Sequence, residues 1–235
     1  MEIHHYTSIE NLALILKNKT IRFTRLDKVD DSEEAGLSCK NIQLSYYTFV
    51  SCWTDSEEES IPLWKMYAGK EMHGIRISLD SDMFLKYHIP SGRFYGVVLY
   101  VDNPFSEMRD VVQIQDMGNG EGAMKMNLKK IGLYKRKCWA FQKEHRFTLT
   151  ILPNIWGDID INQMPKRIMQ AVYDRIPPKL SFFDLEINPE LLSKMKITLS
   201  PICSEAEKVI VESIVQKFAP KAIIRESMLK GLINR

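Results

Sequence analysis

Polar and apolar positions follow two periods along the chain, which predict strands interleaved with helices. Residues 3–6 are expected to form a short strand and residues 20–24 alternate with period two, whereas the apolar positions between them recur every three to four residues up to Asn18. Thr7 and Glu10 stand three residues apart where this helical stretch begins. They are therefore predicted to form a capping box, with Thr7 as the N-cap.

The same two periods continue to the end of the sequence. Further strands are expected at 46–53, 74–79, 94–101, 144–151, 180–185, 195–199 and 222–225. Further helices are expected at 60–69, 124–140 and around 164–173, and from a second capping box at Ser204 to Phe218. The acidic stretch after Leu26 and residues 102–122 are expected to be mainly loop.

The spacing of these elements predicts the fold class. Strands are frequent and are not separated by helices at regular βαβ intervals. The class expected is therefore α+β, with a mixed, largely antiparallel central sheet flanked by helices. The sequence has no internal repeat and no low-complexity linker, which favours a single domain over residues 1–235. Residues 153–178 are expected to form a helical and loop insertion in it.

The predicted strand at 144–151 separates apolar from polar residues most clearly. Alternation places its odd-numbered residues, from His145 to Ile151, on the core face. Glu144 and Arg146 therefore share the opposite, polar face. There they could pair with each other, bond to neighbours across the sheet, or contact a ligand.

Composition places the chain among ordinary globular proteins. Of its 235 residues 45% are hydrophobic and 26% charged, a balance that argues against an intrinsically disordered chain. No apolar run approaches the roughly 18 residues that a membrane span requires, and no signal-peptide pattern is visible. The four cysteines are scattered and are expected to be reduced thiols. We therefore expect a cytoplasmic location and no membrane partner.

Charge is distributed unevenly although the formal net charge is only +2. Residues 125–146 carry eight lysines and arginines and the single acid Glu144, and such a segment could bind nucleic acid. The candidate contacts are Lys125, Lys129, Lys130, Arg136 and Lys137. The alternative is a solvated helix face whose charge is balanced by acidic loops.

Several familiar catalytic and metal-binding patterns are absent. The sequence has no glycine-rich phosphate loop and no Gly-x-Ser-x-Gly nucleophile elbow. His4 and His5 are adjacent, so on a strand they point to opposite faces, and no metal site is expected. Asp31, Glu34 and Glu144 could in principle hold a magnesium ion, but nothing in the sequence brings them together.

Short motifs in a fixed order are similar to those of a bacterial family. They are residues 4–8 (HHYTS), 20–24 (TIRFT), 30–34 (DDSEE), 50–53 (VSCW), 62–68 (PLWKMYA), 73–75 (HGI) and 139–147 (WAFQKEHRF). Together they resemble the family known as domain of unknown function 2971, over nearly the whole chain. The family usually has Asn-Asp-Pro-x-Glu where this chain has residues 30–34, so the turn there is expected to differ. Membership implies no particular activity.

The opening of the chain also resembles, more remotely, certain ADP-ribosyltransferases, including DNA-modifying toxins and RNA 2′-phosphotransferases. The shared features are a His-x-Thr strand (residues 5–7), a helix that begins with an Asn-Leu pair, and a short strand after it. The resemblance implies an NAD cleft within a mixed sheet. In that cleft a histidine binds ribose, an aromatic ring stacks on nicotinamide, and a late acidic residue acts on ribose or the acceptor. It implies the catalytic candidates His5, Tyr67 and Glu144, and the NAD-binding candidates Thr7, Arg22, Trp64 and Arg146. Because the sequence does not determine the facing of the first strand, His4 is the alternative to His5.

Three classes of function follow from these observations. The resemblance implies an NAD-dependent ADP-ribosyltransferase or NAD glycohydrolase, with NAD as substrate, in a toxin or phage-defence setting. The basic segment favours a nucleic-acid-binding protein, and a non-catalytic regulatory or interaction protein is the third class. If His5, Tyr67 and Glu144 meet in an open cleft, the first class is favoured, whereas a filled apolar space would favour the third.

Overall fold

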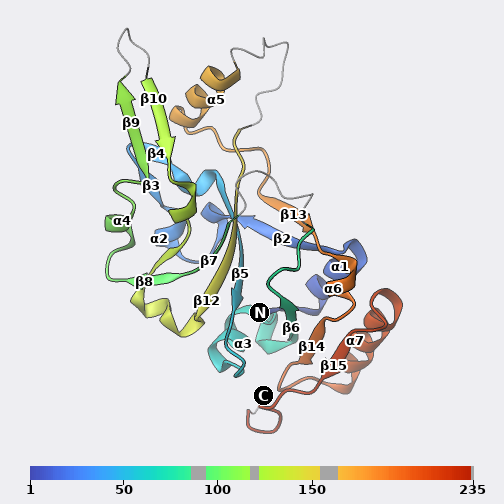
Figure 1. Ribbon diagram of the computed structural model, residues 1–235. Coiled ribbons are helices and arrows are strands. Elements are labelled where there is room, and N and C mark those ends of the chain that lie inside the picture. Colours follow the sequence, from blue (N-terminus) through green and yellow to red (C-terminus); the bar gives the residue numbers. More distant parts are fainter. Residues whose placement is uncertain (86–93, 117–121, 154–163, 234–235) are drawn as a thin grey trace.

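A nine-stranded sheet organises the fold, as Figure 1 shows for the computed structural model. The structure describes residues 1–85, 94–116, 122–153 and 164–233. The strands run in the order β13-β2-β5-β1-β6-β14-β15, and β12 pairs with both β5 and β7. They are β1 (Glu2–Ser8), β2 (Thr20–Arg25), β5 (Thr48–Thr54), β6 (Gly74–Asp80), β7 (Phe94–Val97), β12 (Glu144–Thr150), β13 (Phe182–Glu186), β14 (Lys196–Leu199) and β15 (Ile223–Arg225).

Helices and short strand pairs surround this sheet. The α-helices are α1 (Ile9–Asn18), α2 (Ser32–Ala35), α3 (Ile61–Tyr67), α4 (Pro104–Glu107), α5 (Met164–Tyr173), α6 (Pro189–Leu192) and α7 (Glu205–Phe218). The other strands are β3 (Ser38–Cys39), β4 (Ile42–Gln43), β8 (Leu99–Val101), β9 (Val112–Asp116), β10 (Gly122–Met126) and β11 (Tyr134–Arg136). The 3₁₀ helices are η1 (Leu26–Lys28), η2 (Leu44–Tyr46), η3 (Lys70–Met72), η5 (Leu128–Lys130) and η6 (Lys137–Gln142).

The arrangement confirms the α+β class with a mixed, largely antiparallel sheet. Among the described strands of the large sheet, only β14 and β15 pair in parallel. Figure 1 shows α1 and α7 beside the β14–β15 end, while the β9–β10 hairpin extends from the opposite side. None of the described helices is both long enough and apolar enough to cross a membrane.

Strands β1 and β2 diverge along one edge of β5, and we call this region the fork. On its other edge β5 pairs with β12 along its whole length. At the fork, β2 pairs with residues 49 and 50 only, and β1 pairs with Thr54 only. Cys52 lies between the two diverging strands, where its carbonyl oxygen accepts a hydrogen bond from the His5 imidazole (Nδ1–O 2.7 Å).

The two faces of β12 divide as the alternation predicts. Phe147 and Leu149 are buried in the main hydrophobic core. Glu144 and Arg146 lie on the other face, where they bond to each other. The alternation of residues 144–151 was therefore a reliable guide to the side of the sheet that carries the polar groups.

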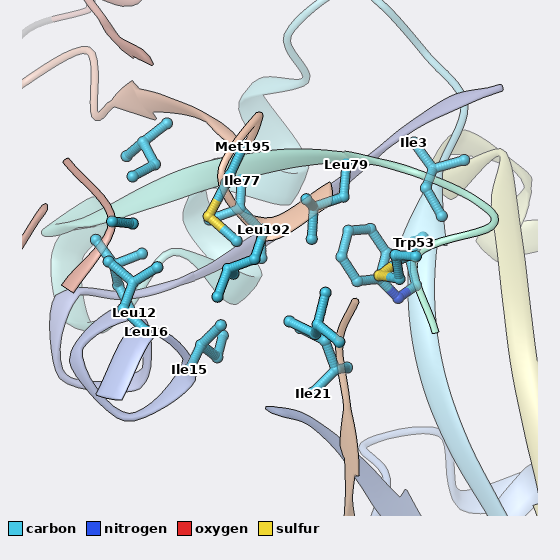
Figure 2. Packing of buried hydrophobic residues seen from close by; sticks show 14 of the residues in the cluster. Ile3, Leu12, Ile15, Leu16, Ile21, Trp53, Ile77, Leu79, Leu192 and Met195 are labelled. Carbon is cyan, nitrogen blue, oxygen red and sulfur yellow. The ribbon is translucent and has the colours of Figure 1, made fainter. Parts of the chain in front are cut away.

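The largest hydrophobic cluster joins α1, α6 and α7 to the sheet. Figure 2 shows part of it, with Leu12, Ile15 and Leu16 of α1 turned toward the residues of the sheet. Full burial of one such side chain stabilises the folded state by about 1.5–3 kcal/mol. A second cluster lies around β9, η2 and α5, and a third lies beneath α3.

Helix α1 begins one residue later than expected. Its N-cap is Ser8, whose side chain accepts a hydrogen bond from the Asn11 amide (3.2 Å). Thr7 still belongs to β1, where it pairs with Ile75, and its hydroxyl instead accepts from the Asn11 side chain (3.0 Å). The second capping box, with Ser204 as the N-cap of α7, is confirmed.

The basic helix expected at 124–140 does not form. The segment contains β10, η5, β11 and η6 instead. Gly132, between η5 and β11, has φ +77°, a left-handed conformation that glycine adopts at no steric cost. Its carbonyl oxygen accepts a hydrogen bond from Arg146 (2.7 Å), so a contact with β12 fixes the break in the segment.

Other boundaries differ from expectation in smaller ways. The strand expected at 94–101 is divided into β7 and β8, and residues 102–122 contain α4 and β9 rather than loop alone. The acidic stretch after Leu26 contains η1 and α2. The helix expected around 164–173 is present as α5, whereas residues 154–163 of the expected insertion lie outside the described residues.

Candidate functional site

A pocket of about 460 Å³ lies at the fork. This volume is in the range of small-molecule sites in proteins. Its walls come from β1, β2, β5, β11, β12, α3 and the segment after η1. Among its lining residues are His4, His5, Arg22, Lys28, Asp30, Glu34, Cys52, Trp53, Tyr67, Lys135, Gln142, Glu144 and Arg146. The structure therefore brings the three catalytic candidates into one open space.

His5 presents a hydrogen-bond acceptor to this pocket. Burial lowers the pKa of His5, so the imidazole is neutral at neutral pH. The Cys52 carbonyl can only accept, so the proton is on Nδ1 and Nε2 is left as an acceptor. His4 also lines the pocket, but its Nδ1 is bonded to the Ser78 hydroxyl (2.7 Å) and its side chain is buried. His5 is thus the histidine suited to bind a ligand hydroxyl.

The Tyr67 hydroxyl is held in place by two hydrogen bonds, one that it donates and one that it accepts. The hydroxyl donates to Asp30 (2.9 Å to Oδ2) and accepts from the Gln142 amide (Nε2–O 2.8 Å). Burial raises the pKa of Tyr67, and the nearby Asp30 carboxylate raises it further. The phenol therefore stays protonated and serves to fix the ring at the pocket wall.

Four buried charged side chains form the floor of the pocket, and we call them the charge cluster: Glu34, Lys135, Glu144 and Arg146. Arg146 donates to Glu144 (Nε–Oε1 2.8 Å) and to Glu34 (Nη1–Oε1 2.5 Å and Nη2–Oε2 3.1 Å). Lys135 Nζ lies 3.0 Å from Glu144 Oε2 and 3.4 Å from Glu34 Oε2. Two carboxylates and two cations make the cluster formally neutral.

The ionisation of Glu144 reflects two opposing effects. Burial favours the neutral acid, but the charges of Arg146 and Lys135 outweigh it and hold the pKa of Glu144 below its ordinary value. Burial raises the pKa of the neighbouring Cys52 thiol, so the thiol is not a nucleophile at neutral pH. The pocket thus contains a fixed carboxylate whose negative charge persists across the physiological pH range.

The two arginines expected to bind NAD have different surroundings. Arg22 is half exposed and forms a bidentate pair with Asp184 (2.9 and 3.0 Å), over the ring of Phe182. Arg146 is fully buried, and each nitrogen of its guanidinium bonds to the cluster. A phosphate could reach Arg22 at the rim, whereas contact with Arg146 would require displacing a carboxylate.

Two of the expected NAD-binding residues lie outside the pocket lining. Thr7 is buried and bonded to Asn11 at the start of α1. Trp64 is fully buried in the cluster beneath α3, where it packs edge-on against Tyr6 and its indole nitrogen donates to Glu59 (3.0 Å). The structure therefore does not bring these two side chains to the pocket with the other candidates. Trp53 of β5 lines the pocket instead.

The residues expected to bind nucleic acid do not share one helix face. Lys125 is in β10, while Lys129 and Lys130 are in η5, and all three side chains are exposed. Arg136 forms a bidentate pair with Glu33, and Lys137 pairs with Asp102. Acidic side chains therefore already neutralise part of the basic segment.

Glu34, Lys135 and Gln142 are pocket residues that sequence reasoning did not select. Glu34 was considered only as a magnesium ligand with Asp31 and Glu144. The structure brings Glu34 and Glu144 together, but Arg146 and Lys135 satisfy their carboxylates, and Asp31 caps α2. Lys135 belongs to the basic segment 125–146, whose composition predicts side chains exposed to solvent rather than buried. Only its contacts with distant segments reveal its place.

Comparison of the chain with protein-family models, with curated proteins and with solved structures found no match. The geometry of the pocket is therefore the basis for assigning a function.

Proposed function

We propose that the chain binds NAD at the fork and cleaves its nicotinamide–ribose bond, as an ADP-ribosyltransferase or an NAD glycohydrolase. The observation that carries the proposal is the convergence of His5, Tyr67 and Glu144 in one pocket of small-molecule size. The proposal extends the resemblance to domain of unknown function 2971 and to ADP-ribosyltransferase-like folds. It includes a cytoplasmic location, where NAD is available, and a toxin or phage-defence setting.

Each of the three residues has a role that its surroundings support. The Nε2 atom of His5 accepts a hydrogen bond from a ribose hydroxyl. The ring of Tyr67, fixed through its hydroxyl, stacks on nicotinamide, and stacking of this kind is worth about 1–3 kcal/mol. Arg22 at the rim approaches the pyrophosphate, in exchange for part of its contact with Asp184.

Glu144 supplies the electrostatic part of the reaction. As the bond between nicotinamide and ribose C1′ breaks, nicotinamide leaves with the bonding electrons and positive charge develops on the ribose. The ionised Glu144 stabilises this oxocarbenium character, as carboxylates do in glycoside cleavage. Water or an acceptor hydroxyl then forms the new bond to C1′ and releases its proton.

Nicotinamide release tests the proposal directly. The purified protein is incubated with NAD alone and with NAD plus nucleic acid or protein acceptors, and nicotinamide is quantified by chromatography. Glu144→Gln should lower turnover about 10²–10³-fold, the usual effect of removing one transition-state contact, while NAD affinity changes little. Glu33→Gln is the matched control, because this half-buried glutamate stands next to Glu34, lies outside the pocket lining and forms a bidentate ion pair with Arg136.

Two outcomes would overturn the proposal. One is the absence of nicotinamide release together with the absence of calorimetric binding at millimolar NAD. The other is an unchanged turnover in a folded Glu144→Gln variant. In either case the pocket would serve a different ligand.

Nucleic-acid binding stays a prediction, and it rests on the exposed side chains of Lys125, Lys129 and Lys130. Retention on a polyanion column should fall steeply with salt if these lysines contact phosphates, and a triple Lys→Gln variant should reduce the salt dependence. Binding that is weak at low salt would exclude this function.

A further inference from the structure

Lys135 occupies an unusual position for a lysine in a basic run. It lies in β11, which pairs in parallel with β8, and its side chain is only 4% exposed. Neighbouring Arg136 on the same strand is exposed, as alternation requires. A buried ammonium is stable only when its donors are satisfied and its charge is paired. The contacts of Lys135 therefore explain why the strand turns this residue inward.

Each hydrogen of the Lys135 ammonium has an acceptor within reach. The Nζ atom lies 2.9 Å from Gln142 Oε1, 3.0 Å from Glu144 Oε2 and 3.4 Å from Glu34 Oε2. An ammonium has three donors and no acceptor, so these three contacts define its orientation completely. The two carboxylates also hold the pKa of Lys135 above its ordinary value, against burial and the charge of Arg146, so it does not act as a base.

Gln142 extends this arrangement across the pocket. Its side-chain oxygen accepts from Lys135, and its amide nitrogen donates to the Tyr67 hydroxyl (2.8 Å), which in turn donates to Asp30. The result is a continuous hydrogen-bonded chain from the Glu144 carboxylate to the Tyr67 ring. Donation therefore runs outward from the Lys135 ammonium, to Glu144 on one side and through the Gln142 amide and the Tyr67 hydroxyl on the other.

We propose that Lys135 is a positioning residue, whose ammonium fixes the Glu144 carboxylate and, through Gln142, the Tyr67 ring in one common geometry. The effect of Lys135 on NAD binding and cleavage rests on the proposed function. The contacts of Lys135 with Glu144 and Gln142 are independent of that function. The basic segment thus contributes a residue to the pocket from its buried side, independently of any contact its exposed lysines make.

Charge removal at Lys135 should change the titration of Glu144. The groups that face the Glu144 carboxylate are Arg146 on the same strand, Lys135, Glu34 and the Cys52 thiol, while the Tyr100 hydroxyl accepts from its backbone amide. Loss of the ammonium leaves Arg146 shared between two carboxylates. We expect the Glu144 carboxyl to titrate about one pH unit higher, since an opposite charge at this range typically shifts a carboxyl by about 1–3 units.

Two variants of Lys135 and one control isolate this effect. Lys135→Met removes charge and donors, whereas Lys135→Gln removes the charge and keeps an amide that can donate. The exposed Lys17→Met variant in α1 removes an equal charge outside the pocket lining. The Glu144 side-chain signal is followed by carbon-13 NMR titration and assigned with Glu144→Gln, and the pH profile of nicotinamide release is measured in parallel.

The two halves of the proposal have separate outcomes. We expect the acid limb of the activity profile to move up by about one pH unit in both Lys135 variants and to stay in place in Lys17→Met. Gln142→Leu keeps the ammonium, so it should leave the Glu144 titration unchanged and raise the KM for NAD about tenfold through a mobile Tyr67 ring. If both Lys135 variants fail to fold, Gln142→Leu still tests the hydrogen-bonded link from Lys135 through Gln142 to Tyr67.

An unshifted Glu144 titration in a folded Lys135 variant, or an unchanged KM in Gln142→Leu, would overturn the positioning role. A uniform loss of activity at every pH, with Glu144 titrating as in the wild type, would show a structural role only. If the wild type itself releases no nicotinamide, the proposed function fails, while the carboxyl titration still decides the place of Lys135.

Discussion

Replacement of Arg146 by methionine would test how the charge cluster is held together. Arg146→Met keeps much of the side-chain volume but leaves Glu34 and Glu144 facing Lys135 as their only cation in the cluster. The guanidinium is fully buried and bonds to both carboxylates and to the Gly132 carbonyl. Removing one partner from a buried ion pair typically destabilises a protein by about 3–5 kcal/mol.

This loss is large compared with the total stability of an ordinary domain, about 5–15 kcal/mol. For a chain of this length it corresponds to a fall in Tm of about 10 °C. Urea denaturation followed by circular dichroism measures the change in the free energy of unfolding, and a constant m value shows that the native state is otherwise intact. Thermal scans give the independent value of Tm.

A matched surface pair separates burial from ion pairing as such. Arg136 contacts Glu33 through two nitrogens, but the pair is largely exposed. Exposed ion pairs contribute little, so Arg136→Met should leave the unfolding midpoint within error. The double variant Arg146→Met/Glu34→Leu restores a neutral cluster and should recover about 2 kcal/mol of the loss. A change under about 1 kcal/mol in Arg146→Met, or a double variant less stable than the single one, would refute this reasoning.

Two further predictions concern backbone packing and pH. Gly74→Ala should lower the free energy of unfolding by about 3 kcal/mol or more, because a Cβ would lie 2.3 Å from two backbone carbonyl oxygens. Gly96→Ala should cost about 1 kcal/mol, because its Cβ meets only the flexible Leu133 side chain; urea denaturation compares the two. Burial, followed by the charge of Arg76, lowers the pKa of His4 to about 4, so stability should fall as pH drops from about 6.5 toward 4, where only the unfolded state takes up the proton. In His4→Asn the free energy of unfolding should depend less on pH over this range than in the wild type. An equal or stronger pH dependence would show that His4 is not the group responsible.

The sequence predicted those parts of the fold that depend on local periodicity. The alternation in residues 144–151 identified the polar face of β12, and the capping box at Ser204 marked the start of α7. Each of these signals is contained within a stretch of a few consecutive residues. The N-cap at Thr7 was wrong by one residue. A threonine and a serine stand side by side there, and the structure gives the Asn11 amide to the Ser8 hydroxyl and the Asn11 side chain to the Thr7 hydroxyl.

The charge cluster depended on contacts that no local pattern contains. The density of lysines after residue 124 suggested a helix, whereas the segment breaks at Gly132, which meets Arg146 from another strand. Lys135 is buried because carboxylates from α2 and β12 compensate its charge. Such compensation is a property of the assembled sheet, so composition alone assigned this lysine to the surface.

The same limit applies to the candidate site. His5, Tyr67 and Glu144 were selected by a resemblance in motif order, and the fork brings them into one pocket. Trp64 was selected by the same resemblance, but its ring lies in the core beneath α3, on the same helix as Tyr67. Spacing along a short helix does not reveal which of two aromatic side chains faces the open space.

The place of β1 in the sheet has a consequence for attempts to divide the protein into fragments. This strand comes from one end of the chain but lies between β5 and β6, and β14, from the other end, lies on the far side of β6. Removal of either end would expose a long row of unpaired amides and carbonyls in the interior of the sheet. Edges of this kind recruit strands from other molecules, so truncated forms should aggregate, and dissection of the pocket requires point substitutions in the intact chain.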